Sequence, residues 1–359
     1  MSEQSAKPPK FFLLKAMIFP VLVVPVVVVT LLVIRGNEAE QLYYQALDLA
    51  AAGKFEAAAE KFKRSGDLGH ADSSYNLALL YSSGALDAPD SAQQVEKNLR
   101  QAALNGSIEA EYELGKIAEY STQPDLDRAA MHYRKAALGG HADALTAMGR
   151  LHENGWGVNQ SLTLAGEFYR KGAQRGGAEN NAELGFFLLS GAEGQSGIDQ
   201  AEAYLQIAAR GKHPKALTAL GYIYEKKQKI TTAVDYYRQA AELNDPEGMV
   251  NYGDHLLKSN RIQDALDLFT RAAEEQNFAP ALHRLGMYYY SLPQPDYPRA
   301  KRYFERAAAQ NNAASWFNLG VMAEHGLGAD KDPARASECY YRAQQLGFKA
   351  DPDSMRQPK

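Results

Sequence analysis

A unit of 32 to 37 residues recurs along most of this sequence, and residues 141–177 (HADALTAMGRLHENGWGVNQSLTLAGEFYRKGAQRGG) show it most clearly. Ala144, Met148 and Leu151 fall three or four positions apart, which predicts one face of a helix. The glycine-containing segment 154–160 has no helical period and predicts a loop. A second helix follows, with Tyr169 on its apolar face. Because neither helix can bury its apolar face alone, each unit has to pack against its neighbours.

Two anchors identify the other copies. In the first helix, a large residue precedes a small one, and the small residues of successive copies are 32 to 37 positions apart. These pairs are Leu77–Ala78, Leu114–Gly115, Met148–Gly149, Leu184–Gly185, Leu220–Gly221, Tyr252–Gly253, Leu285–Gly286 and Leu319–Gly320. In the second helix, an aromatic residue precedes two small residues, as at Tyr133, Tyr169, Tyr204, Tyr237, Phe269 and Phe304. A two-helix unit with this period is typical of an α-solenoid.

The pattern A-x-x-x-L-G-x-x-Y, a glycine-containing loop, then A-x-x-x-Y-x-x-A-A-x-x-G resembles the Sel-one-like repeat, a relative of the tetratricopeptide repeat. Ala144–Gly177 and Ala314–Gly347 match it best. In the copies that start around Gly221 and Gly253, the two anchors are 20 residues apart instead of 24. The four missing residues amount to about one helical turn, so these copies resemble plain tetratricopeptide repeats.

The resemblance implies an all-α fold, a right-handed solenoid of antiparallel helix pairs. We expect about eight units plus an N-terminal helix pair within residues 36–347, and a disordered tail at residues 348–359. The first pair, residues 41–63, is hinged at Gly53 and also resembles a tetratricopeptide repeat. The unbroken repeat argues for one elongated domain.

An apolar run lies near the N-terminus, where residues 16–34 contain no charged side chain. Nineteen helical residues span about 28 Å, enough to cross a bilayer. A cleaved signal peptide or a buried helix are the alternatives, but no small-x-small cleavage site follows the run. We therefore expect a transmembrane helix at residues 11–35, preceded by a cytoplasmic tail at residues 1–10.

The charges that flank this run predict its orientation. Lys7, Lys10 and Lys15 precede it, whereas Arg35 follows it together with nearby acidic residues. By the positive-inside rule, the N-terminus is cytoplasmic and the repeats lie across the membrane. The expected localisation is the inner (cytoplasmic) membrane of a bacterium, as a single-pass protein with a periplasmic repeat domain.

Composition excludes some classes of partner. The chain has 39 basic and 43 acidic residues, and beyond residue 35 the acidic residues outnumber the basic ones by seven. Nucleic acid is an unsuitable partner for an acidic surface, because phosphate neutralisation dominates its binding. The chain's one cysteine, Cys339, allows no intramolecular disulfide and fits either the cytosol or the cell envelope.

No motif indicates catalysis. The sequence lacks a phosphate-binding G-x-x-x-x-G-K-[ST], a G-x-S-x-G and an S-x-x-K motif. The eight histidines have no metal-site spacing; they are His70, His132, His141, His152, His213, His255, His283 and His325. We expect no catalytic, cofactor-binding or metal site, and therefore a protein that is not an enzyme.

Function is then expected on the surface. In repeat proteins of this type, the residue before the first anchor tends to point into the concave groove. These residues are Asn76, Glu113, Ala147, Glu183, Ala219, Asn251, Arg284 and Asn318. The asparagine amides can hold a peptide backbone, and Glu113 and Glu183 favour basic partners. The alternative is a solvated polar face without a partner.

Aromatic residues provide a second candidate surface. Tyr288 and Tyr290 exceed what the repeat pattern needs, and Trp156 lies in a glycine-rich loop, where it either contacts a partner or packs between units. We expect a membrane-anchored scaffold or adaptor that binds a protein in the bacterial cell envelope. The alternative is a periplasmic glycan- or peptidoglycan-binding protein that stacks sugars on these three side chains.

Overall fold

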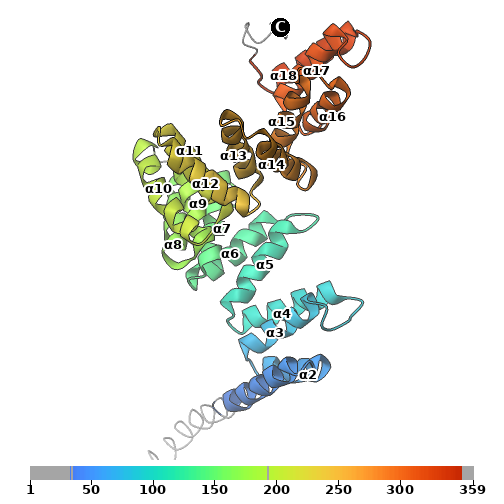
Figure 1. The fold of residues 1–359 in the computed structure, drawn as a ribbon. Helices are drawn as coiled ribbons and strands as arrows, with labels where there is room; N and C mark the ends of the chain where they lie inside the picture. Colours follow the sequence, from blue (N-terminus) through green and yellow to red (C-terminus); the bar gives the residue numbers. More distant parts are fainter. Residues whose placement is uncertain (1–32, 34, 192–193, 350–359) are drawn as a thin grey trace, which may run out of the picture. The chain divides into compact units, whose positions relative to one another are not determined.

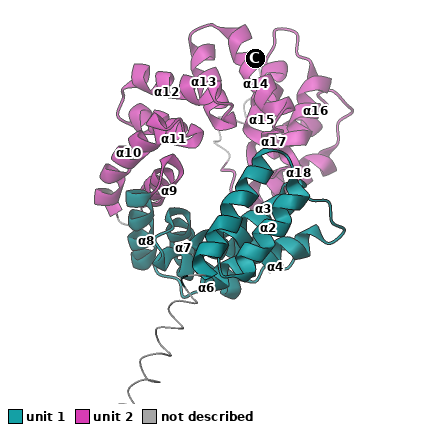
Figure 2. Ribbon diagram, turned by 90° about the horizontal axis from the view of Figure 1, so that it is seen from below, with its two compact units in different colours: residues 1–175 teal, residues 176–359 magenta. Residues whose placement is uncertain are grey.

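In the computed structural model, residues 33, 35–191 and 194–349 are described, and every regular element within them is an α-helix (Figure 1). The predicted all-α fold is confirmed. The chain divides into two compact units at Arg175 (Figure 2). Unit 1 comprises residues 1–175 and unit 2 comprises residues 176–359.

Unit 1 holds four helix pairs in its described part. The first pair is a helix at residues 35–51 followed by α2 (Phe55–Asp67). The others are α3 (Ala71–Ser82) with α4 (Ser91–Leu104), α5 (Ile108–Tyr120) with α6 (Leu126–Leu138), and α7 (Ala142–Asn154) with α8 (Leu162–Arg175). From α2 to α8, each helix contacts the next one along the chain, so the pairs stack in sequence order.

Unit 2 holds five pairs in its described part. They are α9 (Ala178–Leu189) with α10 (Gly194–Arg210), α11 (Pro214–Lys226) with α12 (Ile230–Glu242), α13 (Pro246–Lys258) with α14 (Ile262–Glu274), α15 (Ala279–Tyr290) with α16 (Tyr297–Ala308), and α17 (Ala313–His325) with α18 (Pro333–Gln345). Consecutive helices again contact one another, and the first helices α9, α11, α13 and α15 also touch in series.

The small residue of the first anchor lets the second helix approach closely. A methyl group added at Gly149 would lie 2.9 Å from the ring of Tyr169, and one added at Gly221 would lie 2.4 Å from the ring of Tyr237. Both rings are almost completely buried. The two anchors are therefore one contact, in which a ring of the second helix rests on a glycine of the first.

One predicted anchor is wrong. In α10, the side chain that rests on Gly185 is Leu205, which is fully buried, whereas the neighbouring Tyr204 is only half-buried. The aromatic pattern selected Tyr204 because the sequence offers a tyrosine one position away. The helix instead turns its leucine toward the glycine, since only one of two adjacent residues can face the partner helix.

The shorter copies differ in their turns. Seven residues separate α7 from α8, and Gly155 ends α7 in the left-handed conformation with φ 73°. Three residues separate α11 from α12 and α13 from α14, and Gln228 and Asn260 take the left-handed conformation there, with φ 59° and 61°. The distances between anchors in the sequence thus correspond to two kinds of interhelical connection.

The predicted localisation needs correction. Helices α2 to α18 contain 12 to 17 residues, about 18 to 26 Å, which is shorter than the roughly 30 Å hydrocarbon core. Within the described residues, none of the helices has the length and apolar character needed to cross a membrane. The prediction of a single-pass inner-membrane protein with periplasmic repeats is therefore not supported.

The segment on which that prediction rested, residues 11–35, lies outside the described residues apart from residues 33 and 35. The predicted tail at residues 1–10 also lies outside them, as do residues 350–359 of the predicted C-terminal tail.

Candidate functional site

The first helices of unit 2 carry two rows of side chains on one face. The first row consists of the predicted residues, each of which directly precedes the large residue of the first anchor. The second row lies three positions further along each helix. Positions three apart on a helix are neighbours on its surface. We call the following set the first-helix surface: Glu183, Phe186, Ala219, Tyr222, Asn251, Asp254, Arg284, Met287, Asn318 and Val321. Each of these residues is half-buried or exposed.

Sequence reasoning identified the first row and missed the second. The second row contains Phe186, Tyr222, Asp254, Met287 and Val321. Tyr222 exposes 53% of its surface and Met287 exposes 37%, although both are large apolar side chains. Their spacing could have identified them. Each lies three positions after a residue of the predicted row, and positions three apart share one face of a helix.

Two contacts join the rows of neighbouring repeats. Arg284 on α15 donates from Nε to Oδ1 of Asp254 on α13 over 2.8 Å, and from Nη2 to Oδ2 over 2.7 Å. This is a two-point guanidinium–carboxylate pair, which holds both side chains in a defined geometry. Asn318 on α17 donates from Nδ2 toward Sδ of Met287 on α15 over 3.3 Å. Each contact links a first-row residue to the second row of the preceding repeat.

The predicted positions in unit 1 behave differently. Asn76 donates from Nδ2 to the backbone oxygen of Asp72 in its own helix, over 2.9 Å. Glu113 pairs with Lys116 one turn later, at 2.8 Å. Ala147 is buried. Asn76 and Glu113 thus contact their own helices, and of the eight predicted residues three belong to unit 1 and five to unit 2.

A groove opens beside Glu183. It has a volume of about 430 Å³ and is lined by Glu179, Glu183, Phe186, His213, Pro214, Lys215, Leu243, Asn244, Asp245 and Pro246, from the first helices α9, α11 and α13 and their leading turns. His213 Nε2 lies 3.0 Å from Oε2 of Glu179. Asp245 is buried and accepts hydrogen bonds from the Thr218 hydroxyl (2.7 Å) and the Gly248 N–H (2.8 Å).

Three histidines have a structural role that the sequence did not specify. His70, His141 and His213 each precede a first helix, and each Nδ1 accepts a hydrogen bond from the backbone N–H three residues later. They occupy the N-cap position that Ser107, Asp245 and Asn312 fill in other repeats. In this arrangement the ring proton is on Nε2.

The three predicted aromatic residues belong to different units. Trp156 exposes 42% of its surface and follows α7 in unit 1, whereas Tyr288 and Tyr290 lie on α15 in unit 2. The Tyr290 ring packs edge-on against Tyr297 with centroids 5.7 Å apart, and burial raises its pKa. Tyr288 contacts Tyr289 edge-on at 5.4 Å.

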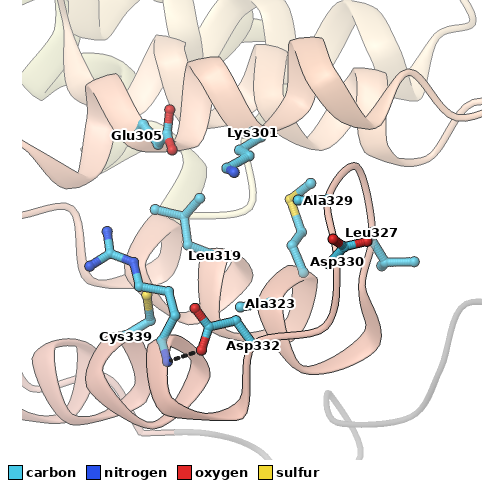
Figure 3. A pocket seen from close by; sticks show the side chains of 11 residues that line it. Lys301, Glu305, Leu319, Ala323, Leu327, Ala329, Asp330, Asp332 and Cys339 are labelled. Atoms are coloured by element: carbon cyan, nitrogen blue, oxygen red, sulfur yellow. Dashed lines mark hydrogen bonds between the residues drawn. The ribbon is translucent and has the colours of Figure 1, made fainter.

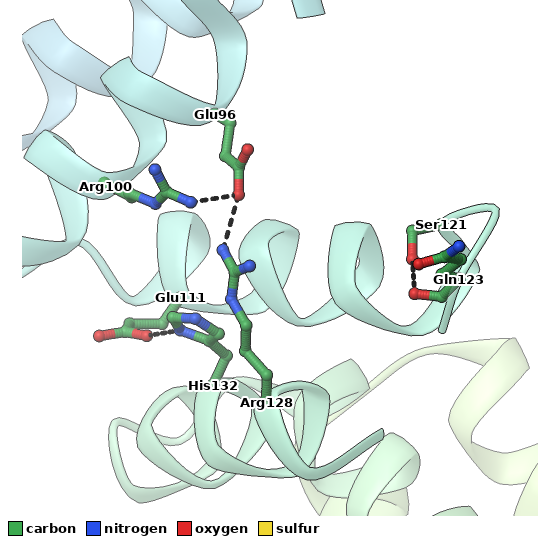
Figure 4. Close-up of polar contacts among 7 residues, drawn as sticks. All are labelled: Glu96, Arg100, Glu111, Ser121, Gln123, Arg128 and His132. Carbon is green, nitrogen blue, oxygen red and sulfur yellow. Dashed lines mark hydrogen bonds and ion pairs between the residues drawn. The ribbon is translucent and has the colours of Figure 1, made fainter. Parts of the chain in front are cut away.

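Several charged side chains in unit 1 pair with one another (Figure 4). Glu96 accepts from Nη2 of Arg100 and from Nη2 of Arg128, both over 2.6 Å. Glu111 lies 2.6 Å from Nδ1 of His132. Arg128 is 32 positions from Glu96, one repeat along the chain, so this pair connects α4 with α6. The Glu96–Arg128 pair thus joins one repeat to the next.

A smaller pocket lies among α16, α17 and α18 (Figure 3). Its volume is about 150 Å³, and Lys301, Glu305, Asp332 and Cys339 are among the residues that line it. Asp332 caps α18 by accepting the N–H of Arg335 over 2.9 Å, and burial raises the pKa of the Cys339 thiol. Within the described part of the chain, no three His, Cys, Asp or Glu side chains are placed to hold a metal ion.

Family comparison identifies both kinds of repeat. The Sel1 repeat matches residues 108–141, 142–177, 279–312 and 315–348. The tetratricopeptide repeat matches residues 191–247 and 218–280. The resemblance to Sel-one-like and tetratricopeptide repeats is confirmed, including the assignment of the two shorter copies to the tetratricopeptide kind.

A solved structure and two curated proteins are similar to this chain. The Sel1 repeat protein of Oxalobacter formigenes superposes with a TM-score of 0.57 at 22% identity, covering 80% of this chain and 86% of that one. An uncharacterised protein of Neisseria meningitidis is 25% identical over 263 residues, 69% of this chain and 48% of its own length. Chitin synthase regulatory factor 3 of Schizosaccharomyces pombe is 24% identical over 242 residues, 62% of this chain and 26% of its own length. The matched regions thus span about half or less of these two curated relatives.

Proposed function

We propose that this chain of Sel1 and tetratricopeptide repeats is a scaffold that binds another protein along the first-helix surface. The observation that carries the proposal is the pair of rows on the first helices of unit 2. Most of their side chains are polar or aromatic, they lie outside the core, and cross-repeat contacts such as Arg284–Asp254 hold some of them in position. A preordered surface binds with a smaller loss of conformational entropy than a mobile one.

The chemistry of this surface suits a peptide segment. The amide of Asn251 can donate to and accept from a peptide backbone, and Tyr222 and Met287 offer exposed apolar area of the kind enriched at interfaces. Contacts are spread over several repeats, so affinity arises from many modest contributions. One relative of this chain bears the name of a chitin synthase regulatory factor, which is in keeping with action through another protein.

Site-specific crosslinking tests the proposal. A photoreactive residue placed at position 251 or 318 should capture the partner in cells, whereas one placed at position 93, on α4, should not. The identified partner is then purified and its Kd measured for the full chain.

The variant Asn251→Ala/Asn318→Ala should bind this partner about fivefold more weakly, because each truncated amide contributes roughly 0.5 kcal/mol. The control Gln200→Ala/Gln345→Ala removes two amides from second helices and should bind normally. An unchanged Kd in the asparagine variant, with unfolding curves unaltered, would refute the role of this surface.

Glycan binding stays the second prediction. It required Tyr288, Tyr290 and Trp156 to act as stacking platforms. Tyr290 packs against Tyr297, and Trp156 belongs to the other unit, so no observation favours this candidate over protein binding.

A further inference from the structure

We propose that the groove beside Glu183 binds a cationic side chain of the partner, with arginine preferred. This inference rests on the proposed scaffold function and names the chemistry of one subsite. The groove lies along α9, α11 and the start of α13, within unit 2. Its volume of about 430 Å³ falls in the range of ligand pockets, roughly 300–1,000 Å³.

The wall formed by α9 combines charge with an aromatic ring. Glu179, Glu183 and Phe186 are spaced by four and three residues, so they lie on one face of the helix and all three line the groove. A guanidinium group can lie flat on a phenyl ring while its N–H groups reach carboxylates. Within this chain, the guanidinium of Arg335 already lies over the Trp316 ring, 5.9 Å from its centroid.

The balance of charge in the groove favours a cation. Glu179, Glu183 and the buried Asp245 contribute negative charge, whereas Lys215 contributes positive charge and His213 is bonded to Glu179. The buried Asp245 accepts hydrogen bonds from the Thr218 hydroxyl and from the backbone N–H of Gly248. An anionic side chain would meet an excess of carboxylates, which attract a cation and repel an anion.

Elsewhere in unit 2, an arginine of the chain itself pairs with a carboxylate between two first helices. Between α13 and α15, the first-row residue Arg284 reaches back to the second-row residue Asp254 of the preceding repeat. Between α9 and α11, the equivalent positions hold Ala219 and Phe186. Phe186 lines the groove, so an arginine from a partner would meet its ring there instead of a carboxylate at this position.

Peptide display on the immobilised full chain provides the test. A random heptapeptide library is selected against the wild-type protein, and the enriched peptides are synthesised twice, once as selected and once with each arginine replaced by citrulline. Citrulline keeps the shape of arginine and removes the charge. We expect enrichment of arginine, and an affinity about tenfold lower for the citrulline peptides. This corresponds to about three- to fivefold for each of the two carboxylates, Glu179 and Glu183.

Matched variants locate the effect. In Glu179→Gln/Glu183→Gln, the arginine and citrulline peptides should bind about equally, and Lys215→Ala should bind the arginine peptides more tightly than the wild type. The control Asp267→Asn/Glu275→Gln changes the net charge by the same amount at exposed positions on and just after α14, and it should retain the preference for arginine.

The outcomes separate the two proposals. Peptides that bind the first-helix surface with no preference for arginine would overturn the cation subsite and leave the scaffold intact. If both double variants lost the preference for arginine equally, the attraction would be nonspecific, and this result would also overturn the subsite. Failure to select any peptide that depends on the first-helix surface would overturn both proposals.

Discussion

The hydroxyl group of Tyr169 on α8 donates a hydrogen bond to Oε2 of Glu153 on α7, over 2.8 Å. The Tyr169 ring is buried on Gly149, so its hydroxyl emerges at the end of the first helix, where Glu153 lies one turn beyond the glycine. The carboxylate therefore satisfies a polar group that the packing of the two helices brings to the edge of the core.

The same relationship recurs wherever the ring on the anchor glycine belongs to tyrosine. The further pairs are Tyr133–Glu119 at 2.7 Å, Tyr237–Glu225 at 3.0 Å and Tyr340–Glu324 at 2.6 Å. Where the packed residue lacks a hydroxyl group, the position of the glutamate is not acidic: Leu205 faces Leu189, Phe269 faces Leu257, and Phe304 faces Tyr290. A glutamate thus occurs at this position of the first helix where the second helix places a tyrosine hydroxyl group beside it.

Removing the carboxylate should destabilise unit 1 in a way that depends on the hydroxyl. Glu119 is buried and accepts from Tyr133 and from Nη2 of Arg150. We expect Glu119→Leu to lower the free energy of unfolding by about 2 kcal/mol and Tyr133→Phe by about 1 kcal/mol. In the double variant the losses should fall short of their sum by about 1 kcal/mol, since each removes the same bond. Urea unfolding of the four proteins measures this coupling, and additive losses would contradict it.

A methyl group at an anchor glycine should disrupt the helix pair. At Gly221, an added Cβ would lie 2.4 Å from the Tyr237 ring, so the ring or the helix has to move. We expect Gly221→Ala to cost about 1–3 kcal/mol, as overpacked cores do. The control is Gly177→Ala, where nothing lies within 4 Å of the added atom and φ is −87°. Its stability should change by less than about 0.5 kcal/mol, and equal losses at both sites would refute the close-approach explanation.

Stability should decrease in mild acid because of His283. Burial, with a smaller contribution from Arg284, lowers the pKa of this imidazole to about 4, and its Nδ1 lies 2.9 Å from the Ser315 hydroxyl. In the unfolded chain the imidazole has its ordinary pKa of about 6.5, so unfolded molecules bind the proton first as the pH falls. The free energy of unfolding is therefore highest above pH 6.5 and decreases as the pH approaches 4. The loss reaches up to about 3 kcal/mol.

Urea unfolding of wild type and His283→Gln at pH 7, 6 and 5 tests this expectation. The variant should lose part of the slope of stability against pH. The prediction is wrong if both proteins show the same slope.

The Cys339 thiol should react slowly in the folded chain. Only 1% of its surface is exposed, and burial raises its pKa, so little thiolate is available for attack. We expect a coloured disulfide reagent at pH 8 to react at least ~100-fold faster after denaturation. Since the chain holds one cysteine, the reaction of a single thiol is followed directly. A rate in the native protein close to that in urea would show that α18 does not bury the thiol.

Much of the fold was predictable because the residues that pack the two helices of a repeat lie within that repeat, at regular spacing. The spacing of Met148 and Gly149 from Tyr169 specified two helices and their contact, and the shorter spacing after Gly221 specified a tighter turn. The aromatic pattern selected Tyr204, but Leu205 has the spacing to the small residue Ala208 that the aromatic anchors of the other copies have, and Leu205 is the residue that meets Gly185.

The candidate site was only partly predictable. The first row, with Asn251 and Arg284, follows from its position before the anchors. The pairing of Arg284 with Asp254, and the groove that Glu183 shares with Lys215 and Asp245, join residues of different repeats. No local pattern in the sequence specifies which of these side chains meet.

By itself, the sequence determined that the chain builds helix pairs, and where each pair begins and ends, because periodicity and glycine placement act within about 36 residues. Only the tertiary structure decided that the repeats divide into two units at Arg175 and that the helices of the described residues are too short to cross a membrane. It also decided which charged side chains pair across repeats. The physical reason is that stacking depends on side chains a full repeat apart, such as Arg284 and Asp254, whose meeting depends on how one helix pair rotates against the next.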